Sequence, residues 1–189
     1  MSKFRYLIGM GRLCLISLFS GGKLKYKGIQ KADPSADFDT LSGGRIDIGR
    51  RCSFGKNAEL AAVEGRIRIG DGVHMGSNCL VVAHGEITVG DGTMFGPHVY
   101  IYDHDHVIDR ENCAISRSEY ETAPVSIGRN CWIGANTVIL KGTVIGDNVT
   151  VGAGSVVSGS IPGSSIFFQP REKVIKPYKT GKNESTDSN

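Results

Sequence analysis

The chain has 189 residues, a length that suits one domain, and its 22 Lys and Arg nearly balance its 19 Asp and Glu, for a formal net charge of +3 at pH 7. Basic residues are scattered rather than interleaved with aromatic ones, which argues against a nucleic-acid partner. The cysteines are odd in number and include no CxxC pair, so we expect no zinc site of the cysteine type; they are Cys14, Cys52, Cys79, Cys113 and Cys131.

The N-terminus carries an apolar run from Tyr6 to Phe19 that Arg12 interrupts. The run is too short and too charged to span a bilayer, and no small-residue cleavage site follows it, as a secretory signal would require. We expect residues 1–44 to form a helix and a basic linker. Two interpretations stay open. Either the helix packs on the end of the domain or on a neighbouring subunit, or residues 3–27 make a peripheral membrane contact with anionic head groups.

Beyond the linker, an aliphatic or aromatic residue recurs every six positions, without a break from Val125 to Ser160. A six-residue period of this kind predicts a parallel β-helix with three hexapeptides in each coil. The recurring residues are Ile48, Phe54, Leu60, Ile69, Met75, Val81, Val89, Phe95, Ile101, Ile127, Ile133, Ile139, Ile145, Val151 and Val157.

Corner residues follow the same period. Three places after the recurring residue stands Asn or Gly, which tolerate the left-handed backbone of a sharp corner; these are Asn57, Gly72, Asn78, Gly92, Asn130, Asn136, Gly142, Asn148 and Gly154. His84 and His98 occupy this position too, and we expect the same backbone conformation there. Cys79 and Cys131 fall on inward positions, which predicts buried, reduced thiols in a cytoplasmic protein.

The period slips at three places. Two gaps predict small bulges at residues 64–66 and 85–86. Between Ile101 and Ile127 the gap is far longer, so residues 103–124 must leave the solenoid as a loop, and such loops on rigid scaffolds often carry function. We therefore assign residues 45–162 to the β-helix domain, 163–179 to a strand or helix tail that packs on it, and 180–189 to a disordered tail.

Two motifs carry a family resemblance. Cys131 to Asn136 reads Cys-Trp-Ile-Gly-Ala-Asn, and Val151 to Val157 reads Val-Gly-Ala-Gly-Ser-Val-Val, followed by Ile161-Pro162. They resemble the C-terminal half of the hexapeptide-repeat acyltransferases, and among these the sugar O-acetyltransferases of the galactoside and maltose type and those of polysaccharide and lipopolysaccharide assembly. The resemblance covers residues 46–176.

The resemblance implies an all-β, left-handed parallel β-helix that works as a homotrimer. It implies acetyl-CoA as acyl donor, bound in a groove between two subunits, with no metal required. It also implies a histidine general base on the protruding loop. Counted from Pro97 and Ile101, the family's catalytic histidine falls on His106, and His104, two residues earlier in the same Asp-His-Asp-His string, stays open as the alternative.

The proposed chemistry explains the need for a histidine. A sugar hydroxyl is a poor nucleophile at neutral pH, and an imidazole can accept its proton as it attacks the thioester carbonyl. Backbone N–H groups along the coil are candidates to stabilise the oxyanion. One acidic residue of the loop could orient the imidazole, and the sequence leaves open which; the candidates are Asp103, Asp105, Asp109 and Glu111.

The other site residues come from the resemblance. It implies acetyl-CoA contacts at Trp132, Ala135, Ala153, Ser158, Arg171 and Lys173, with Lys141 a further candidate for a phosphate, and acceptor contacts at Asn78, His84, Tyr100 and Asp103. Galactoside-type enzymes carry Asn and Asp where this chain has Gly76 and His84, which argues against a simple galactoside or maltose acceptor. Trp132 precedes an inward residue, so we expect it to point outward at a subunit interface or groove.

These observations predict an acetyl-CoA-dependent O-acetyltransferase that acts on a carbohydrate acceptor in surface polysaccharide or lipopolysaccharide biosynthesis, in the cytoplasm or at the inner face of the membrane. Three alternatives stay open. They are an N-acetyltransferase acting on an amino sugar nucleotide, a zinc enzyme similar to the γ-class carbonic anhydrases with ligands from His74, His98, His104 and His106, and a non-catalytic solenoid that binds a partner.

Overall fold

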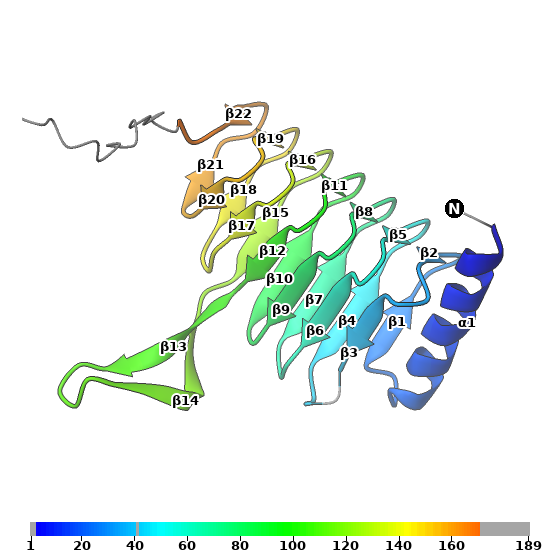
Figure 1. The fold of residues 1–189 in the computed structure, drawn as a ribbon, viewed down its shortest axis with the longest axis horizontal. Coiled ribbons are helices and arrows are strands. Elements are labelled where there is room, and N and C mark those ends of the chain that lie inside the picture. The colour runs from blue at the N-terminus through cyan, green and yellow to red at the C-terminus, as the bar shows by residue number, and fades with distance from the viewer. Residues whose placement is uncertain (1–2, 41, 171–189) are drawn as a thin grey trace, which may run out of the picture.

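The computed structural model describes residues 3–40 and 42–170, and it shows a parallel β-helix with an α-helix across one end and a long hairpin projecting from its side (Figure 1). Three parallel sheets form the walls. Sheet A contains β1 (Leu24–Tyr26), β4 (Arg45–Ile48), β7 (Arg66–Ile69), β10 (Glu86–Val89), β15 (Val125–Ile127), β18 (Val144–Ile145) and β21 (Ser160–Ile161). Sheet B contains β2 (Lys31–Ala32), β5 (Ser53–Phe54), β8 (His74–Met75), β11 (Met94–Phe95), β16 (Trp132–Ile133), β19 (Thr150–Val151) and β22 (Ile166–Phe167).

Sheet C contains β3 (Asp37–Asp39), β6 (Glu59–Ala62), β9 (Leu80–Ala83), β12 (Tyr100–Tyr102), β17 (Val138–Ile139) and β20 (Val156–Val157). The remaining elements are α1 (Lys3–Phe19) at the N-terminal end and the hairpin strands β13 (His104–Asp109) and β14 (Ala114–Thr122). Successive coils add one strand to each sheet, so a residue lies beside its counterpart from the next coil.

The side chains that recur every six residues form the core of the solenoid. In sheet A, the recurring residues Ile48, Ile69, Val89 and Ile127 are register partners, and all four are buried. Alternate residues of each strand point inward, as in any β-strand, so like side chains stack on like from coil to coil. Each fully buried aliphatic side chain stabilises the fold by roughly 1.5–3 kcal/mol. The predicted parallel β-helix is therefore confirmed.

The corners have the predicted backbone at most positions. Asn57, Asn78, His98 and Asn136 turn the chain from sheet B to sheet C with φ between 53° and 59°. The expectation for His98 is thus confirmed. It was wrong for His84, which is not among the described residues with positive φ. His84 instead lies at a wider corner between β9 and β10, and its contacts are described with the site.

The solenoid begins earlier than expected. Strands β1, β2 and β3 already form a coil, with Leu24 paired to Ile46, Lys31 to Ser53 and Phe38 to Leu60. The basic linker expected up to residue 44 is therefore largely the first coil of the β-helix. At the other end β19 pairs with β22, so the sheets continue to Phe167. The expected tails from residue 171 onward lie outside the described residues.

Helix α1 packs tightly on this first coil. Leu13 is buried, and Gly9 lies so close to the Ala32 carbonyl that a side chain would not fit. Arg5 forms an ion pair with the buried Asp33 at 2.9 Å, and Arg12 forms one with Asp37 at 2.6 Å. Burial alone would raise the pKa of Asp33, but hydrogen bonds from Ser35 and the charge of Arg5 outweigh it and lower that pKa below its ordinary value.

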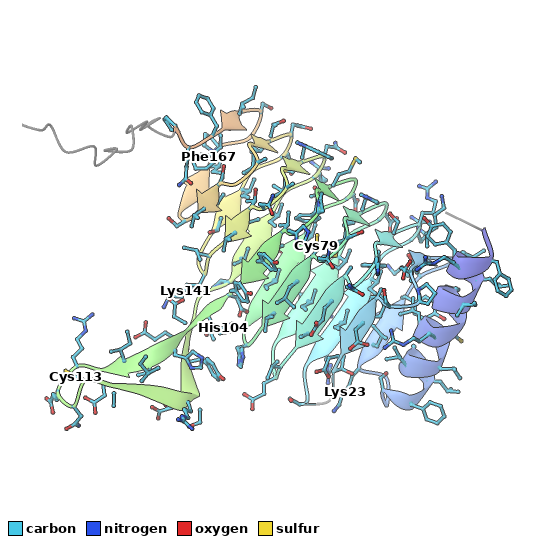
Figure 2. All side chains as sticks on the ribbon, in the orientation of Figure 1. Lys23, Cys79, His104, Cys113, Lys141 and Phe167 are labelled. Carbon is cyan, nitrogen blue, oxygen red and sulfur yellow. The ribbon has the colours of Figure 1, made fainter. Side chains whose placement is uncertain are left out.

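The cysteines follow the prediction where it was made. Cys79 and Cys131 are buried and free, as is Cys52, and burial raises the pKa of Cys52 and Cys79. Cys14 and Cys113 are exposed, the latter at the tip of the hairpin (Figure 2).

Candidate active site

The loop that interrupts the sequence period is a two-stranded antiparallel arm. It leaves sheet C after β12, runs out along β13 and returns along β14 to sheet A at β15, well away from the stacked coils (Figure 1). At its base His104 lies opposite Thr122, Asp105 opposite Glu121 and His106 opposite Tyr120. The excursion predicted for residues 103–124 is therefore present, and its base carries both candidate histidines.

Strand alternation gives the arm base two different faces. His104 and His106 are two residues apart and share one face with their cross-strand neighbour Tyr120. Asp105 and Glu121 share the other face, where both meet the ammonium group of Lys141. One face of the arm thus presents imidazoles and a phenol, and the other face is held by an ion-pair cluster.

Asp103 anchors the histidine face to the preceding coil. Its side chain is fully buried, and its carboxylate accepts the backbone N–H groups of His84 at 2.9 Å and of Gly85 at 2.8 Å. The same carboxylate lies 3.1 Å from Nδ1 of His104. These three groups take three of the roughly four lone-pair sites of the carboxylate, and Asp103 thereby positions His104. The acceptor contact that the resemblance implied for Asp103 stays a prediction.

Each candidate histidine has its Nδ1 atom fixed by an acceptor. Nδ1 of His104 faces the Asp103 carboxylate, and Nδ1 of His106 lies 3.0 Å from the backbone carbonyl oxygen of Ser116. A carbonyl or carboxylate oxygen can only accept, so in the neutral form of both rings Nδ1 carries the proton and Nε2 has the lone pair. Only 13% of the His104 side chain is exposed, whereas His106 is exposed to solvent.

The rings form a cluster of tilted contacts at the arm base. His84 reaches across from the preceding coil, with its centroid 4.2 Å from that of His104 and 3.9 Å from that of Tyr120, while the His106 and Tyr120 centroids are 4.8 Å apart. Burial, followed by the repulsion of a charged His104, lowers the pKa of His84. His84 therefore joins the histidine site through its ring and not through a left-handed corner. The acceptor contact that the resemblance implied for it stays a prediction.

Lys141 fastens the opposite face. Its Nζ lies 3.1 Å from the Asp105 carboxylate and 3.0 Å from that of Glu121, and the hydrogen bonds that it donates to Glu121 and to Asp105 raise the pKa of this lysine. Figure 2 shows Lys141 and His104 near each other at the root of the arm. A lysine that could have met a CoA phosphate is therefore engaged in holding the arm.

The other expected residues lie elsewhere on the chain. Asn78 belongs to a ladder at the corner between sheets B and C, with Asn57 and His98 as partners. Tyr100 lies on the outer side of sheet C, two residues before Tyr102. Trp132 points outward from β16, as predicted, and is 46% exposed. Ala135 and Ala153 lie at successive corners beyond it, and Ser158 is exposed after β20; Arg171 and Lys173 fall outside the described residues.

The site includes residues that the sequence did not single out. Tyr120 and Glu121 join it because β14 pairs back on β13, with an irregularity in register between His106 and Ile108. A hairpin with its turn near residues 110–113 could have been suspected from the alternation of His104 and His106 with Tyr120 and Thr122. The irregular register would still have left the pairing ambiguous.

The four histidines of the zinc hypothesis do not converge. His74 lies on β8 of sheet B beside Ser53, and His98 lies at the corner between sheets B and C, whereas His104 and His106 lie at the arm base. Within residues 3–40 and 42–170, no group of three or more His, Cys, Asp or Glu side chains is arranged to hold a metal ion. Over the same residues, no helix has the length and apolarity needed to cross a membrane.

Comparisons with known proteins match the repeat region. Residues 124–159 match the family described as "Bacterial transferase hexapeptide (six repeats)", and residues 45–83 match "Hexapeptide repeat of succinyl-transferase". A protein of Escherichia coli K12 named "Putative lipopolysaccharide biosynthesis O-acetyl transferase WbbJ" is 32% identical over 71% of this chain and 73% of its own length. A protein of Mycobacterium tuberculosis named "Probable acetyltransferase Rv3034c" is 34% identical over 70% of this chain, which spans 44% of that relative.

Solved structures share the fold. AntD, an N-acyltransferase from Bacillus cereus seen with dTDP and 3-hydroxybutyryl-CoA, superposes with a TM-score of 0.64 at 21% identity, covering 79% of this chain and 81% of AntD. NeuO, described as a polySia-specific acetyltransferase, superposes with a TM-score of 0.54 at 20% identity, covering 86% of this chain and 77% of NeuO.

Proposed function

This chain belongs to the hexapeptide-repeat acyltransferase family, and we propose on that basis that it transfers an acetyl group from acetyl-CoA to a hydroxyl group of a carbohydrate acceptor. The observation that carries the proposal is the histidine pair at the arm base. Both rings have Nδ1 bound to an acceptor and Nε2 free to take a proton. The similarity to WbbJ, at 32% identity over most of both chains, supports an oxygen rather than a nitrogen acceptor.

We assign the general base to His106. Its ring is exposed, so an acceptor can reach Nε2, while the Ser116 carbonyl holds Nδ1. His104 has little exposed surface and packs against His84 in a tilted ring contact, and its Nδ1 faces Asp103. In this arrangement His104 and Asp103 support the ring cluster that positions the acceptor and the base.

The acetyl group passes directly from CoA to the acceptor, through a tetrahedral intermediate. Nε2 of His106 takes the proton of the acceptor hydroxyl as its oxygen forms a bond to the thioester carbonyl carbon. The resulting oxyanion is stabilised by backbone N–H groups of the coil. The intermediate collapses with cleavage of the carbon–sulfur bond, and the imidazolium returns the proton to the departing thiolate of CoA. No acyl-enzyme and no metal are needed.

We further propose that the working form is a homotrimer. In one copy the histidine cluster lies at the corner between sheets C and A, whereas Trp132, Ala135 and Ala153 lie on sheet B and at the next corner. Within one chain, the base therefore lies apart from the residues that we propose to contact CoA. Trp132 and Met94 are register partners that leave 46% and 43% of their surface exposed, which suits cover by a neighbouring copy.

Sedimentation equilibrium of the purified protein tests the trimer directly. Three times the chain mass is the expected result, and Trp132→Ala is expected to shift the equilibrium toward smaller species. A monomer that transfers acetyl groups at full rate would overturn the shared site. For the biological setting, we propose surface polysaccharide or lipopolysaccharide assembly in the cytoplasm, supported by the name of the WbbJ relative.

Calorimetric titration with acetyl-CoA, followed by a thiol-release assay, tests the activity. The acceptor panel contains sugars, nucleotide-sugars and oligosaccharides, each with a matched amino sugar. Binding of acetyl-CoA with thiol release on a hydroxyl acceptor is the expected result. Release only with amino sugars would replace the O-transfer by an N-transfer, and failure to bind acetyl-CoA would overturn the acyltransferase function.

A further inference from the structure

The outer face of α1 is an apolar stripe that no other element among residues 3–40 and 42–170 covers. Leu7, Ile8, Leu15, Leu18 and Phe19 are each between 48% and 83% exposed. Their spacing of three, four and seven residues places them on one side of the helix, and the stripe contains no charged residue. Soluble surfaces rarely expose a contiguous apolar patch of this kind without a binding role.

The inner face of the same helix fixes the stripe in place. Gly9 and Leu13 pack on the first coil, and the guanidinium groups of Arg5 and Arg12 both turn inward to Asp33 and Asp37. Arg12 also donates to the backbone carbonyls of Pro34 and Ala36. The helix therefore lies fixed across the end of the solenoid (Figure 1). Its apolar stripe is exposed on the side away from these contacts.

Positive charge surrounds this end of the molecule. Residues 1–40 contain seven Lys and Arg against three Asp, whereas the remaining residues contain fifteen Lys and Arg against sixteen Asp and Glu. The formal positive charge of the chain thus resides in its N-terminal part. Lys25 and Lys27 line a surface groove beside the C-terminal half of α1, and the one acidic residue of its lining, Asp47, is paired with Arg66. Lys23 lies at the same end of the helix (Figure 2).

We propose that this end of the solenoid binds in plane to an anionic membrane surface, with the stripe at the acyl boundary and Lys23, Lys25 and Lys27 among the head groups. An apolar helix face with adjacent lysines is the chemistry that anionic lipid surfaces attract. A second copy is a poorer occupant, because two ends meeting stripe to stripe would bring their lysines together. The contact is independent of the acetyl transfer proposed above.

Vesicle flotation of the full-length protein tests the proposal. The vesicles contain phosphatidylcholine alone or mixed with phosphatidylglycerol, at low and high salt. One variant carries Leu7→Gln and Leu18→Gln, and another carries Lys23→Gln and Lys25→Gln. The matched control is Ile166→Gln, an exposed aliphatic side chain at the opposite end of the solenoid. Each change is on the surface, so all three variants are expected to fold, and thermal melts check this.

The wild type and the control are expected to float with the phosphatidylglycerol vesicles and to be released by salt. Each helix-end variant should bind the same vesicles at least about tenfold more weakly than the wild type, because two charges or two apolar anchors are lost. Failure of the wild type to float, or equal flotation of the stripe variant, would overturn the proposal. If the wild type forms an end-to-end assembly that is absent in the stripe variant, the face binds a second copy instead.

Discussion

Asp103 and His104 are adjacent in the chain, and together they join the arm to the solenoid. The Asp103 carboxylate turns into the core and accepts two N–H groups from the preceding coil, while the His104 ring turns outward and keeps Nδ1 within 3.1 Å of that carboxylate. On the other face Lys141, from the following coil, holds Asp105 and Glu121. The arm base is therefore fastened to coils on both sides, and this orients the two imidazoles.

Replacing each histidine in turn should distinguish the roles of His104 and His106. His106→Ala is expected to lower kcat by about 10²- to 10⁴-fold, the range of a lost general base, and to leave the calorimetric affinity for acetyl-CoA nearly unchanged. His104→Ala should cost less, since its ring is largely buried. If the larger loss follows His104→Ala, the base is His104 with Asp103 as its partner.

The buried carboxylate should matter for stability as well as for rate. Asp103→Asn keeps the shape but places an amide N–H₂ against a donor N–H of His84 or Gly85. We expect the free energy of unfolding to fall by roughly 1–3 kcal/mol, as for a buried donor left unsatisfied. Urea titration measures this change. An unaltered midpoint in Asp103→Asn would contradict the anchoring role.

The ion-pair cluster should control the order of the arm rather than the stability of the coils. Lys141→Met removes the cation between Asp105 and Glu121, so trypsin should cut at Arg110 or Arg117 faster, and turnover should fall. The melting temperature of the solenoid should stay close to that of the wild type. Lys56→Met, on an exposed corner, serves as the matched control. Equal cleavage rates in both variants would show that Lys141 does not hold the arm.

Acid should destabilise the protein in part through His84. Burial lowers its folded-state pKa below 6.5, and the charge of His104 lowers it further, while Asp103 and Glu64 oppose the shift. The unfolded chain then binds more protons below pH 6.5, so stability is constant above that pH and is lost as the pH falls through the folded pKa. His84→Gln should flatten the decline in melting temperature between pH 7 and pH 5. His74 contributes in the same direction, because burial lowers its pKa too.

Two glycines of α1 should respond in opposite directions to the same change. A methyl group at Gly9 would collide with the Ala32 carbonyl, whereas Gly11 has nothing within 4 Å of the added atom. Gly11→Ala should raise the free energy of unfolding by up to about 1 kcal/mol through helix propensity. Gly9→Ala should lower the melting temperature and loosen the helix from the first coil. Equal melting temperatures would contradict the close packing of α1.

The repeat was readable because its physical cause is local. A coil corner needs a residue that tolerates positive φ, and an inward strand position needs an apolar side chain. The residue types of Asn78 and Ile133 therefore predict a corner and an inward position without further information. The outward direction of Trp132 and the burial of Cys79 and Cys131 followed from the same count. The position of the arm followed from the interruption of the period.

The first coil and the site depended on contacts that the sequence does not display. β1, β2 and β3 lack the regular hexapeptide, yet they form a coil because β4, β5 and β6 offer them edges to pair with and α1 covers the end. Residue type alone suggested a left-handed corner at His84, but the Asp103 carboxylate captures its N–H and turns its ring onto His104 and Tyr120.

The sequence by itself thus determined the solenoid, its corners, the exit of the arm and the candidate histidines, because each depends on a periodic or local preference. Only the tertiary structure decided which acidic residue faces which imidazole, where Lys141 is engaged and which face of α1 remains uncovered. Those features arise from the register of β13 on β14 and from the stacking of distant coils, which bring together residues that no local preference relates.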